Sequence, residues 1–220
     1  MQFQFSNDVA KLQPSAIREI LKFTSMPGVI SFAAGNPAPE AFPTELIADL
    51  SSKLLREHPV MAMQYSITEG YPELREQLKQ WMTEKHCFSP ETDDLIITSG
   101  AQQANELSCK VLLIYIIPNF QNPTGRVTSL EKRKGIYELA CKYNVAILED
   151  DPYGELRISG ESVPSLKSMD TEGRVLYAGS FSKILAPGFR VGYLSAPKEL
   201  VQKVVVCKQV SDVHTNIWAQ

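Results

Sequence analysis

The sequence places one primary amine beside groups that bind phosphate. Lys183 directly follows the run Ser180–Ser182, and Arg190 comes seven residues later. A lysine amine can condense with an aldehyde to a Schiff base, while serine hydroxyls and a guanidinium can hold a phosphate on the same molecule. A phosphorylated aldehyde cofactor requires this set of groups. A serine and a lysine at this spacing also occur in ordinary solvated turns, so the interpretation depends on the rest of the chain.

A second feature that suits an anion lies upstream. Residues 94–98 have the pattern of a buried strand, and the run Ser99–Gln103 leads directly into a helix. Backbone N–H groups and the positive end of the helix dipole converge at such a turn, so we expect a phosphate there. The run is not GxGxxG and lacks the Lys-Ser/Thr of a P-loop, so nucleotide binding is not indicated.

Polar residues also follow two other predicted strands. The run Asn119–Gly125 follows the strand pattern at 113–118, and the run Glu149–Tyr153 follows the pattern at 145–148. Turn chemistry and solvation are the ordinary explanations for such residues. A helix pattern after Thr128 separates these two strands, and further strand patterns follow at 174–178 and 191–196. This order favours an α/β fold with a mostly parallel sheet and helices on both faces. In such sheets, ligands bind at the carboxyl ends of the strands.

The N-terminal part predicts a helix from Pro14 that carries Arg18, and a strand at 29–33 that ends in a turn containing Gly35. Arg18 is by default a solvated helix charge. Thr44 is the expected cap of a helix with an apolar stripe of period 3.6. Further on, Thr128 and Glu131 have the spacing of a capping box.

One junction lacks the residues that a turn needs. The helix pattern at 104–112 runs straight into the strand pattern at 113–118, with no Gly, Pro, Asn or Asp between them. A helix and a following parallel strand need a connecting turn. We therefore expect that a segment is missing near 112–113.

Composition excludes several classes of function. The 220 residues are 44% hydrophobic and 21% charged, as in ordinary globular domains. A net charge of −3 gives no basic surface for nucleic acid. No leader-like N-terminus or membrane-length apolar run is present, and the four cysteines are widely spaced. We expect a cytoplasmic protein with reduced thiols, no membrane or nucleic-acid partner and no metal site.

Six motifs together resemble the fold-type I pyridoxal-phosphate aminotransferases, in particular the class I subgroup of kynurenine, 2-aminoadipate and aromatic aminotransferases. In chain order they are Ala33–Pro37 with Phe42-Pro43, Gln64-Tyr65, Ser99–Gln103, Ile117–Gly125, Glu149–Tyr153 and Ser180–Arg190. The resemblance covers nearly the whole chain. It implies a homodimeric enzyme that moves an amino group between an amino acid and a 2-oxo acid, with pyridoxal 5'-phosphate as cofactor.

The resemblance also implies roles for single residues. Lys183 would bind the cofactor aldehyde and shuttle the substrate proton. Asp150 would pair with the pyridine nitrogen, and Asn122 and Tyr153 would hydrogen-bond the 3-oxygen of the ring. The residues expected at the phosphate are Gly100, Ala101, Gln102, Ser180, Ser182, Arg190 and, from the neighbouring subunit, Tyr65. The residues expected at the substrate are Arg18, Gly35 and Asn122.

Two departures from the family pattern limit this interpretation. The family has a longer segment between the helix after Ser99–Gln103 and the strand before Asn122, which includes the aromatic residue that stacks on the ring. It also continues past Gln220 into a small domain with the arginine that binds the substrate carboxylate. We therefore expect an N-terminal arm at 1–30 and an incomplete cofactor-binding large domain at 31–220.

Other functions stay open or fit poorly. A non-catalytic fragment of such an enzyme, or a lyase or decarboxylase of the same fold, would carry the same cofactor motifs. A serine acyl-enzyme at Ser180 would need S-D-N and K-T-G partners, which the sequence lacks. A transcriptional regulator of related sequence would carry a helix-turn-helix domain, and only a short segment precedes Ala33.

Overall fold

The computed structural model describes residues 23, 26–30, 35, 37–109 and 113–220. The chain divides into two compact units, Met1–Glu40 and Ala41–Gln220. The predicted helix that carries Arg18 lies outside the described residues, and so does most of the predicted strand at 29–33. The elements that carry the remaining motifs belong to the larger unit.

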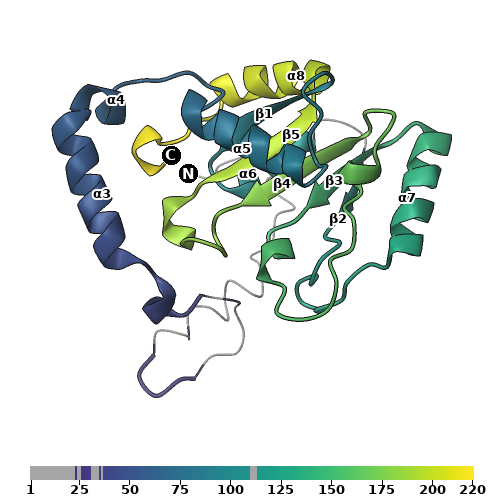
Figure 1. Cartoon of the computed structure of the whole chain (residues 1–220), viewed down its shortest axis with the longest axis horizontal. Coiled ribbons are helices and arrows are strands. Elements are labelled where there is room, and N and C mark those ends of the chain that lie inside the picture. The colour runs from purple at the N-terminus through teal and green to yellow at the C-terminus, as the bar shows by residue number, and fades with distance from the viewer. Residues whose placement is uncertain (1–22, 24–25, 31–34, 36, 110–112) are drawn as a thin grey trace, which may run out of the picture. The chain divides into compact units, whose positions relative to one another are not determined.

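A five-stranded sheet in the order β1-β5-β4-β3-β2 forms the centre of the larger unit (Figure 1). β2, β3 and β4 are mutually parallel, while β5 runs antiparallel to both of its neighbours, β1 and β4. The carboxyl ends of all strands except β5 therefore meet at one edge, which confirms the predicted mostly parallel sheet. The strands are β1 (Asp93–Thr98), β2 (Leu113–Ile116), β3 (Ala146–Asp150), β4 (Val175–Ser180) and β5 (Gly192–Pro197).

Helices cover both faces of the sheet, as predicted. Alternate residues of each strand point to opposite faces, and the core divides accordingly. α6 and α8 pack on the face that contains Leu148 and Leu194. α5 and α7 pack on the other face, against Tyr193 and Ile147 respectively. The α-helices are α3 (Thr44–Glu57), α4 (Pro59–Met63), α5 (Pro72–Glu84), α6 (Ala101–Ser108), α7 (Leu130–Tyr143) and α8 (Lys198–Gln209).

Both predicted helix caps are wrong by one residue. α3 has Pro43 at the N-cap, and Thr44 is its first helical residue. α7 is capped by Ser129, whose hydroxyl accepts from the Lys132 N–H at 3.4 Å. Thr128 does not cap this helix because its backbone is held in the preceding loop, where its N–H donates to the Pro118 carbonyl at 2.8 Å.

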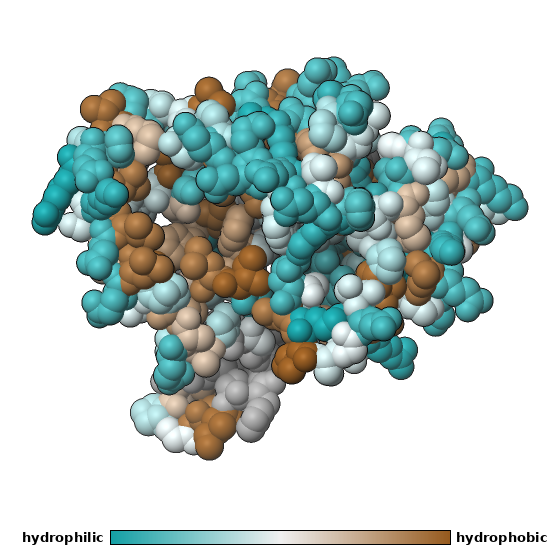
Figure 2. Space-filling view, in the orientation of Figure 1, coloured by the Kyte–Doolittle hydropathy of each residue, from teal (hydrophilic) through white to brown (hydrophobic). Residues whose placement is uncertain are grey.

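The apolar stripe of α3 is on the surface rather than in the core. None of the residues of this helix is buried, and Leu46 and Leu50 are 58% and 56% exposed. Figure 2 shows apolar side chains gathered on this side of the molecule. The prediction of a helix was right, but its apolar face lines an open groove, together with Leu185, Phe189 and Trp218, rather than a closed core.

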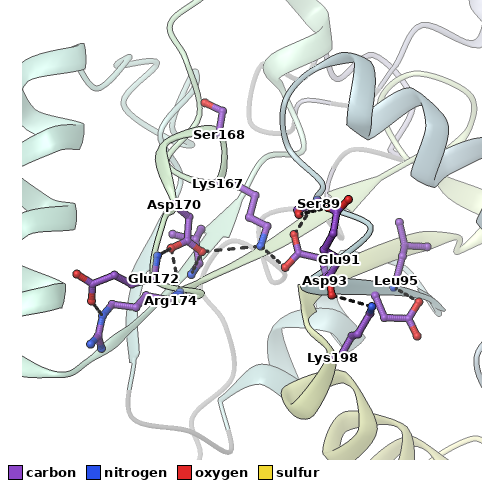
Figure 3. Close-up of polar contacts among 12 residues, drawn as sticks. Ser89, Glu91, Asp93, Leu95, Lys167, Ser168, Asp170, Glu172, Arg174 and Lys198 are labelled. Atoms are coloured by element: carbon purple, nitrogen blue, oxygen red, sulfur yellow. Dashed lines mark hydrogen bonds and ion pairs between the residues drawn. The ribbon is translucent and has the colours of Figure 1, made fainter.

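A buried ion pair joins the start of β1 to the loop before β4. The Lys167 ammonium lies 2.9 Å from Asp93 Oδ1 and 3.8 Å from Asp170 Oδ2 (Figure 3). Asp170 also accepts from the backbone N–H groups of Arg174 and Val175, at 3.0 and 2.9 Å. We call Lys167, Asp93 and Asp170 the Lys167 cluster. It links chain segments at the edge of the sheet opposite to the strand ends that carry the predicted site.

Candidate active site

Two adjacent parallel strands bring the predicted ring-binding and amine groups to the same edge. Asp150 ends β3 and pairs in register with Ala178 of β4. β4 ends two residues later at Ser180, and Lys183 comes three residues after that. Because neighbouring parallel strands end at one edge of a sheet, Asp150 and the Ser180–Lys183 segment lie on the same side of the molecule.

Asp150 is buried, and within the described part of the chain only one of its two carboxylate oxygens is hydrogen-bonded. Oδ2 accepts from the Tyr115 hydroxyl at 2.6 Å and from the Asn105 amide at 2.9 Å. Among the described residues, Oδ1 is buried and has no hydrogen-bond partner. Burial raises the pKa of Asp150, and the hydrogen bonds from Tyr115 and Asn105 act against this increase. We call Asp150, Asn105 and Tyr115 the Asp150 cluster.

Asn105 and Tyr115 were not among the residues predicted from the sequence. Tyr115 pairs in register with Leu148, so it shares the face of Asp150. Asn105 stands on α6 next to the buried residue Ala104, on the helix that begins at the glycine turn. The only local signal was a polar side chain beside the apolar positions of α6. Contact with Asp150 follows from the strand order and the helix packing, which no local pattern contains.

The turn before α6 is closed by an arginine from a distant segment. Gly100 has a φ of +77°, and a Cβ at this position would lie 2.6 Å from Arg190 Nη2. The Arg190 guanidinium donates to the Ser182 hydroxyl at 3.3 Å, and the Ser182 N–H donates to the Ser180 hydroxyl at 3.1 Å. Free backbone N–H groups at the start of α6, a guanidinium and two hydroxyls are therefore brought together, as an anion site requires.

The buried Lys208 ammonium supports the residues of this turn. The Lys208 ammonium donates to Gln103 Oε1 at 3.0 Å and to Asp212 Oδ1 at 2.7 Å. Gln103 Oε1 also accepts from the Ser99 N–H at 2.8 Å, and the Ser99 hydroxyl donates to Asp212 at 2.7 Å. Gln103 is thus buried and structural, whereas Gln102, the residue predicted at the phosphate, is exposed next to the turn.

The two residues predicted for the 3-oxygen of the ring lie side by side. The Asn122 amide donates to the Tyr153 hydroxyl at 3.3 Å. Their segments are held together by Asn119 and Asp151, whose side chains are joined by a 3.0 Å hydrogen bond. The loop after β2 and the loop after β3 therefore form one surface at the carboxyl edge of the sheet.

Lys183 has the electrostatics that its predicted role needs. Partial burial lowers the pKa of its ammonium group. The charged form is disfavoured when an amine leaves water, so a larger share of the lysine is neutral at a given pH. The neutral amine is the form that acts as a nucleophile or as a base.

For three predicted residues the structure does not test the expected role. Tyr65 is 82% exposed, and its ring contacts His214 edge to face at 6.0 Å between centroids. Gly35 belongs to the unit Met1–Glu40. Arg18 lies outside the described residues. The predicted roles of all three stay predictions.

Residues 108–219, half of the chain, match the model of the protein family described as "Aminotransferase class I and II". The chain belongs to this family. The Thermococcus litoralis protein named aromatic-amino-acid aminotransferase 1 is 36% identical, over 98% of this chain and 66% of the relative. The Thermus thermophilus 2-aminoadipate transaminase is 35% identical, over 98% of this chain and 67% of the relative.

A solved structure of a family member has the same fold. The crystal structure of Pyrococcus horikoshii kynurenine aminotransferase in complex with PMP aligns with a TM-score of 0.88 and 33% identity. The alignment covers 98% of this chain and 67% of that one. The chain thus spans about two thirds of the length of the aminotransferases it matches, and it has their fold-type I architecture.

The length of one alignment bears on the junction near 112–113. The match with the Thermococcus aminotransferase runs over 274 residues, although this chain has 220. That relative therefore contains residues within the aligned region that this chain lacks. In the structure, α6 ends at Ser108 and β2 begins at Leu113, and residues 110–112 are outside the described part. The exact position of the missing segment stays a prediction.

The described residues fit the cofactor of this family. The unpaired Oδ1 of Asp150 is a buried acceptor for a ring N–H group. The Gly100 turn with Arg190 Nη2 against it leaves no room for a side chain. The first N–H groups of α6, at Ala101 and Gln102, have no acceptor within the helix and can serve a phosphate. Within the described ranges, no three His, Cys, Asp or Glu side chains form a possible metal site. Among the described helices, none has the length and apolar character that crossing a membrane requires.

Proposed function

We propose that this chain binds pyridoxal 5'-phosphate and transfers an amino group between an amino acid and a 2-oxo acid. The observation that carries the proposal is the buried Asp150 oxygen that has no partner in the described part of the chain. It lies at the sheet edge where the Gly100 turn, Arg190 and Lys183 also lie. A carboxylate with an open acceptor costs stability unless a donor occupies it. A pyridine ring with a protonated nitrogen supplies that donor.

Each group has a defined task. When bound, the cofactor ring accepts the electron pair that remains when a proton leaves the substrate Cα. Lys183 holds the cofactor and, as a neutral amine, takes up and returns that proton. Asp150 keeps a proton on the ring nitrogen. Asn122 and Tyr153 hydrogen-bond the 3-oxygen of the ring.

The phosphate is expected at the turn that begins α6. Gly100, Ala101 and Gln102 form this turn. Ala101 and Gln102 would supply backbone N–H groups, because the Gly100 N–H donates to the Thr98 carbonyl at 2.8 Å. Ser180, Ser182 and Arg190 would supply hydroxyl and guanidinium donors. The place of Arg190 Nη2, 2.6 Å from where a Cβ on residue 100 would lie, supports this set. Because the groups are prearranged, little ordering is needed when a phosphate binds.

The substrate class is proposed from the relatives. Those matched here are named for aromatic amino acids, 2-aminoadipate and kynurenine. We propose an amino acid of this kind as the amino donor, with Arg18 and Gly35 near the substrate. We also propose that the protein acts in the cytoplasm.

We further propose a homodimer in which Tyr65 reaches the phosphate of the neighbouring subunit. The exposure of Tyr65, together with that of Val60 and Met63 on α4, supports a covered surface in the assembly. Sedimentation velocity at micromolar concentration should show a dimer. A monomer under those conditions would contradict the proposal.

The function is tested by adding pyridoxal 5'-phosphate to the purified chain. The wild type should show a visible absorbance band of protein-bound cofactor that Lys183→Ala abolishes, while Lys134→Ala on the exposed face of α7 keeps it. Transfer to a 2-oxo acid is then measured by mass spectrometry with aromatic amino acids and 2-aminoadipate. Loss of Lys183 should lower the rate by about 100-fold or more, as for other groups that transfer the proton.

The outcomes separate the alternatives. Absence of the Lys183-dependent band would reject cofactor binding. A band without amino transfer would favour a non-catalytic fragment of an aminotransferase. Release of carbon dioxide or of a cleaved side chain, in place of a new amino acid, would favour a decarboxylase or a lyase.

A further inference from the structure

The two hydrogen bonds to Asp150 go to the same oxygen. Tyr115 donates from β2 and Asn105 from α6, at 2.6 and 2.9 Å, and both contact Oδ2. Among the described residues, Oδ1 has no partner although it is buried. Two donors on one oxygen fix the rotation of the carboxylate about its last side-chain bond. The arrangement therefore determines which oxygen is presented to a ligand.

The donors also tie Asp150 to the anion turn. Asn105 lies on α6, the helix that begins directly after Gly100. It is four residues after Ala101, so the two residues are on the same side of the helix. A rigid helix turn thus connects the N–H groups proposed for the phosphate with the donor that holds Asp150. This fixes two contacts of one ligand relative to each other.

The orientation of the Asn105 amide follows from the charge of its partner. With Nδ2 toward Asp150, the amide donates to a carboxylate, while its own Oδ1 is buried and has no partner among the described residues. The reversed amide would place two acceptors against each other as long as Asp150 is ionised. The unpaired Asn105 carbonyl is thus the cost of presenting a donor to Asp150.

Resting on the proposed function, we propose that Asn105 and Tyr115 are positioning residues for the ring-nitrogen contact of Asp150. They hold Oδ2, so that Oδ1 remains directed at the ring N–H group. They also stabilise the carboxylate form of Asp150, because both donate to it. Neither residue needs to touch the reacting atoms for this effect.

The proposal makes a specific prediction about which ligands the site distinguishes. Pyridoxal 5'-phosphate offers a ring N–H group to Asp150, whereas its carbocyclic analogue with CH in place of the ring nitrogen does not. The aldehyde, the 3-oxygen and the phosphate are the same in both. The ratio of the two dissociation constants therefore reports on the Asp150 contact alone.

The experiment measures both dissociation constants by calorimetry for the wild type, Asn105→Leu, Tyr115→Phe and the double variant. The wild type should bind pyridoxal phosphate about 10- to 100-fold more tightly than the analogue, as expected for a hydrogen bond to a charged group. Each single variant should reduce this preference by about 3- to 10-fold, the range of one hydrogen bond. Tyr143→Phe, which removes an exposed hydroxyl on α7, is the matched control and should keep the full preference.

A double-mutant cycle with Asp150→Asn tests whether Asn105 changes the ligand preference through Asp150. In that background Asn105→Leu should leave the preference unchanged, because the group that it positions is already altered. A general loss of stability in Asn105→Leu would weaken the binding of both ligands alike and leave the ratio unaffected. Tyr115→Phe keeps the ring volume and provides an independent measurement if Asn105→Leu does not fold.

The results distinguish the two proposals. If the wild type binds neither ligand, the proposed function is rejected. If the wild type binds both ligands equally, only the positioning role is rejected. The positioning role is also rejected if the wild type prefers pyridoxal phosphate and the Tyr115→Phe and Asn105→Leu variants fold and keep that full preference.

Discussion

The Lys167 cluster and the Asp150 cluster are both buried and both contain carboxylates, but their oxygens are used differently. In the Lys167 cluster, Asp93 accepts from the Lys167 ammonium with Oδ1 and from the Ser89 N–H at 3.1 Å with Oδ2 (Figure 3). In the Asp150 cluster one oxygen accepts two hydrogen bonds, and the other has no partner among the described residues. One cluster is complete within the chain, whereas the other is open to a ligand.

The contrast recurs between two neighbouring residues of β3. Glu149 points to the face opposite Asp150, and both of its oxygens accept backbone N–H groups, from Leu166 at 2.9 Å and Lys167 at 2.8 Å. Burial of a carboxylate is tolerated when its acceptors are satisfied. A side chain that is buried without full satisfaction reduces stability, and binding sites retain such groups because a ligand completes them. The number of satisfied acceptors, rather than burial, distinguishes the functional carboxylate from the structural one.

The largest effect is expected from breaking the complete cluster. Lys167→Met would leave Asp93 and Asp170 buried without their cation. Removal of one partner of a buried pair costs about 3–5 kcal/mol, so the free energy of unfolding in urea should fall by this amount. The affinity of the folded variant for pyridoxal phosphate should stay as in the wild type, because the cluster lies at the opposite edge of the sheet.

A surface pair provides the control. Lys79 lies 3.1 Å from both Glu76 and Asp94, but these carboxylates are more exposed. Lys79→Met should therefore cost less than about 1 kcal/mol. Equal losses for Lys167→Met and Lys79→Met would show that the Lys167 cluster adds nothing through its burial.

A smaller and pH-dependent effect is expected at Glu149. Burial raises the pKa of this carboxyl from 4.5 to about 7. Between these values the folded state holds more protons than the unfolded state, so this group makes stability fall as pH rises from 4.5 to about 7. The contribution amounts to at most about 3 kcal/mol. Above about pH 7 it no longer changes.

Glu149→Gln cannot titrate, so its stability relative to the wild type should increase as pH rises through this window. Urea unfolding at a series of pH values measures the difference between the two proteins. Glu138→Gln, at an exposed position of α7, is the matched control and should follow the wild type. A constant difference between Glu149→Gln and the wild type across the window would contradict the assignment.

Local sequence patterns were sufficient to predict most strands and helices of the larger unit. The apolar runs before Ser99 and Glu149 predicted β1 to within one residue and β3 to within two. The caps of α3 and α7 were missed because loop hydrogen bonds, such as the one from the Thr128 N–H, decide where a helix begins. The exposure of α3 could not be predicted, because periodicity gives the apolar face of a helix but not the surface that covers it.

For the site, the sequence supplied candidate residues but not their contacts. Strand-end motifs indicated Asp150, Asn122 and the Ser180–Arg190 segment, and the structure places these at one edge of the sheet. Their functional roles stay predictions. Asn105 and Tyr115 were not predicted because their contact with Asp150 depends on β2 lying beside β3 and on α6 packing over both.

The smallest effect on stability is expected where the largest effect on binding is proposed. Asp150→Asn keeps an oxygen for the Tyr115 and Asn105 donors, and it replaces the unpaired oxygen by an amide. Burial raises the pKa of Asp150, so the charged form already opposes folding near neutral pH. The free energy of unfolding of the cofactor-free chain should therefore change by less than about 1 kcal/mol. Asp93→Asn, which weakens the complete cluster, should cost clearly more. If Asp150→Asn proved the more destabilising of the two, Asp150 would be part of the structural framework, and the distinction between an open and a complete cluster would fail.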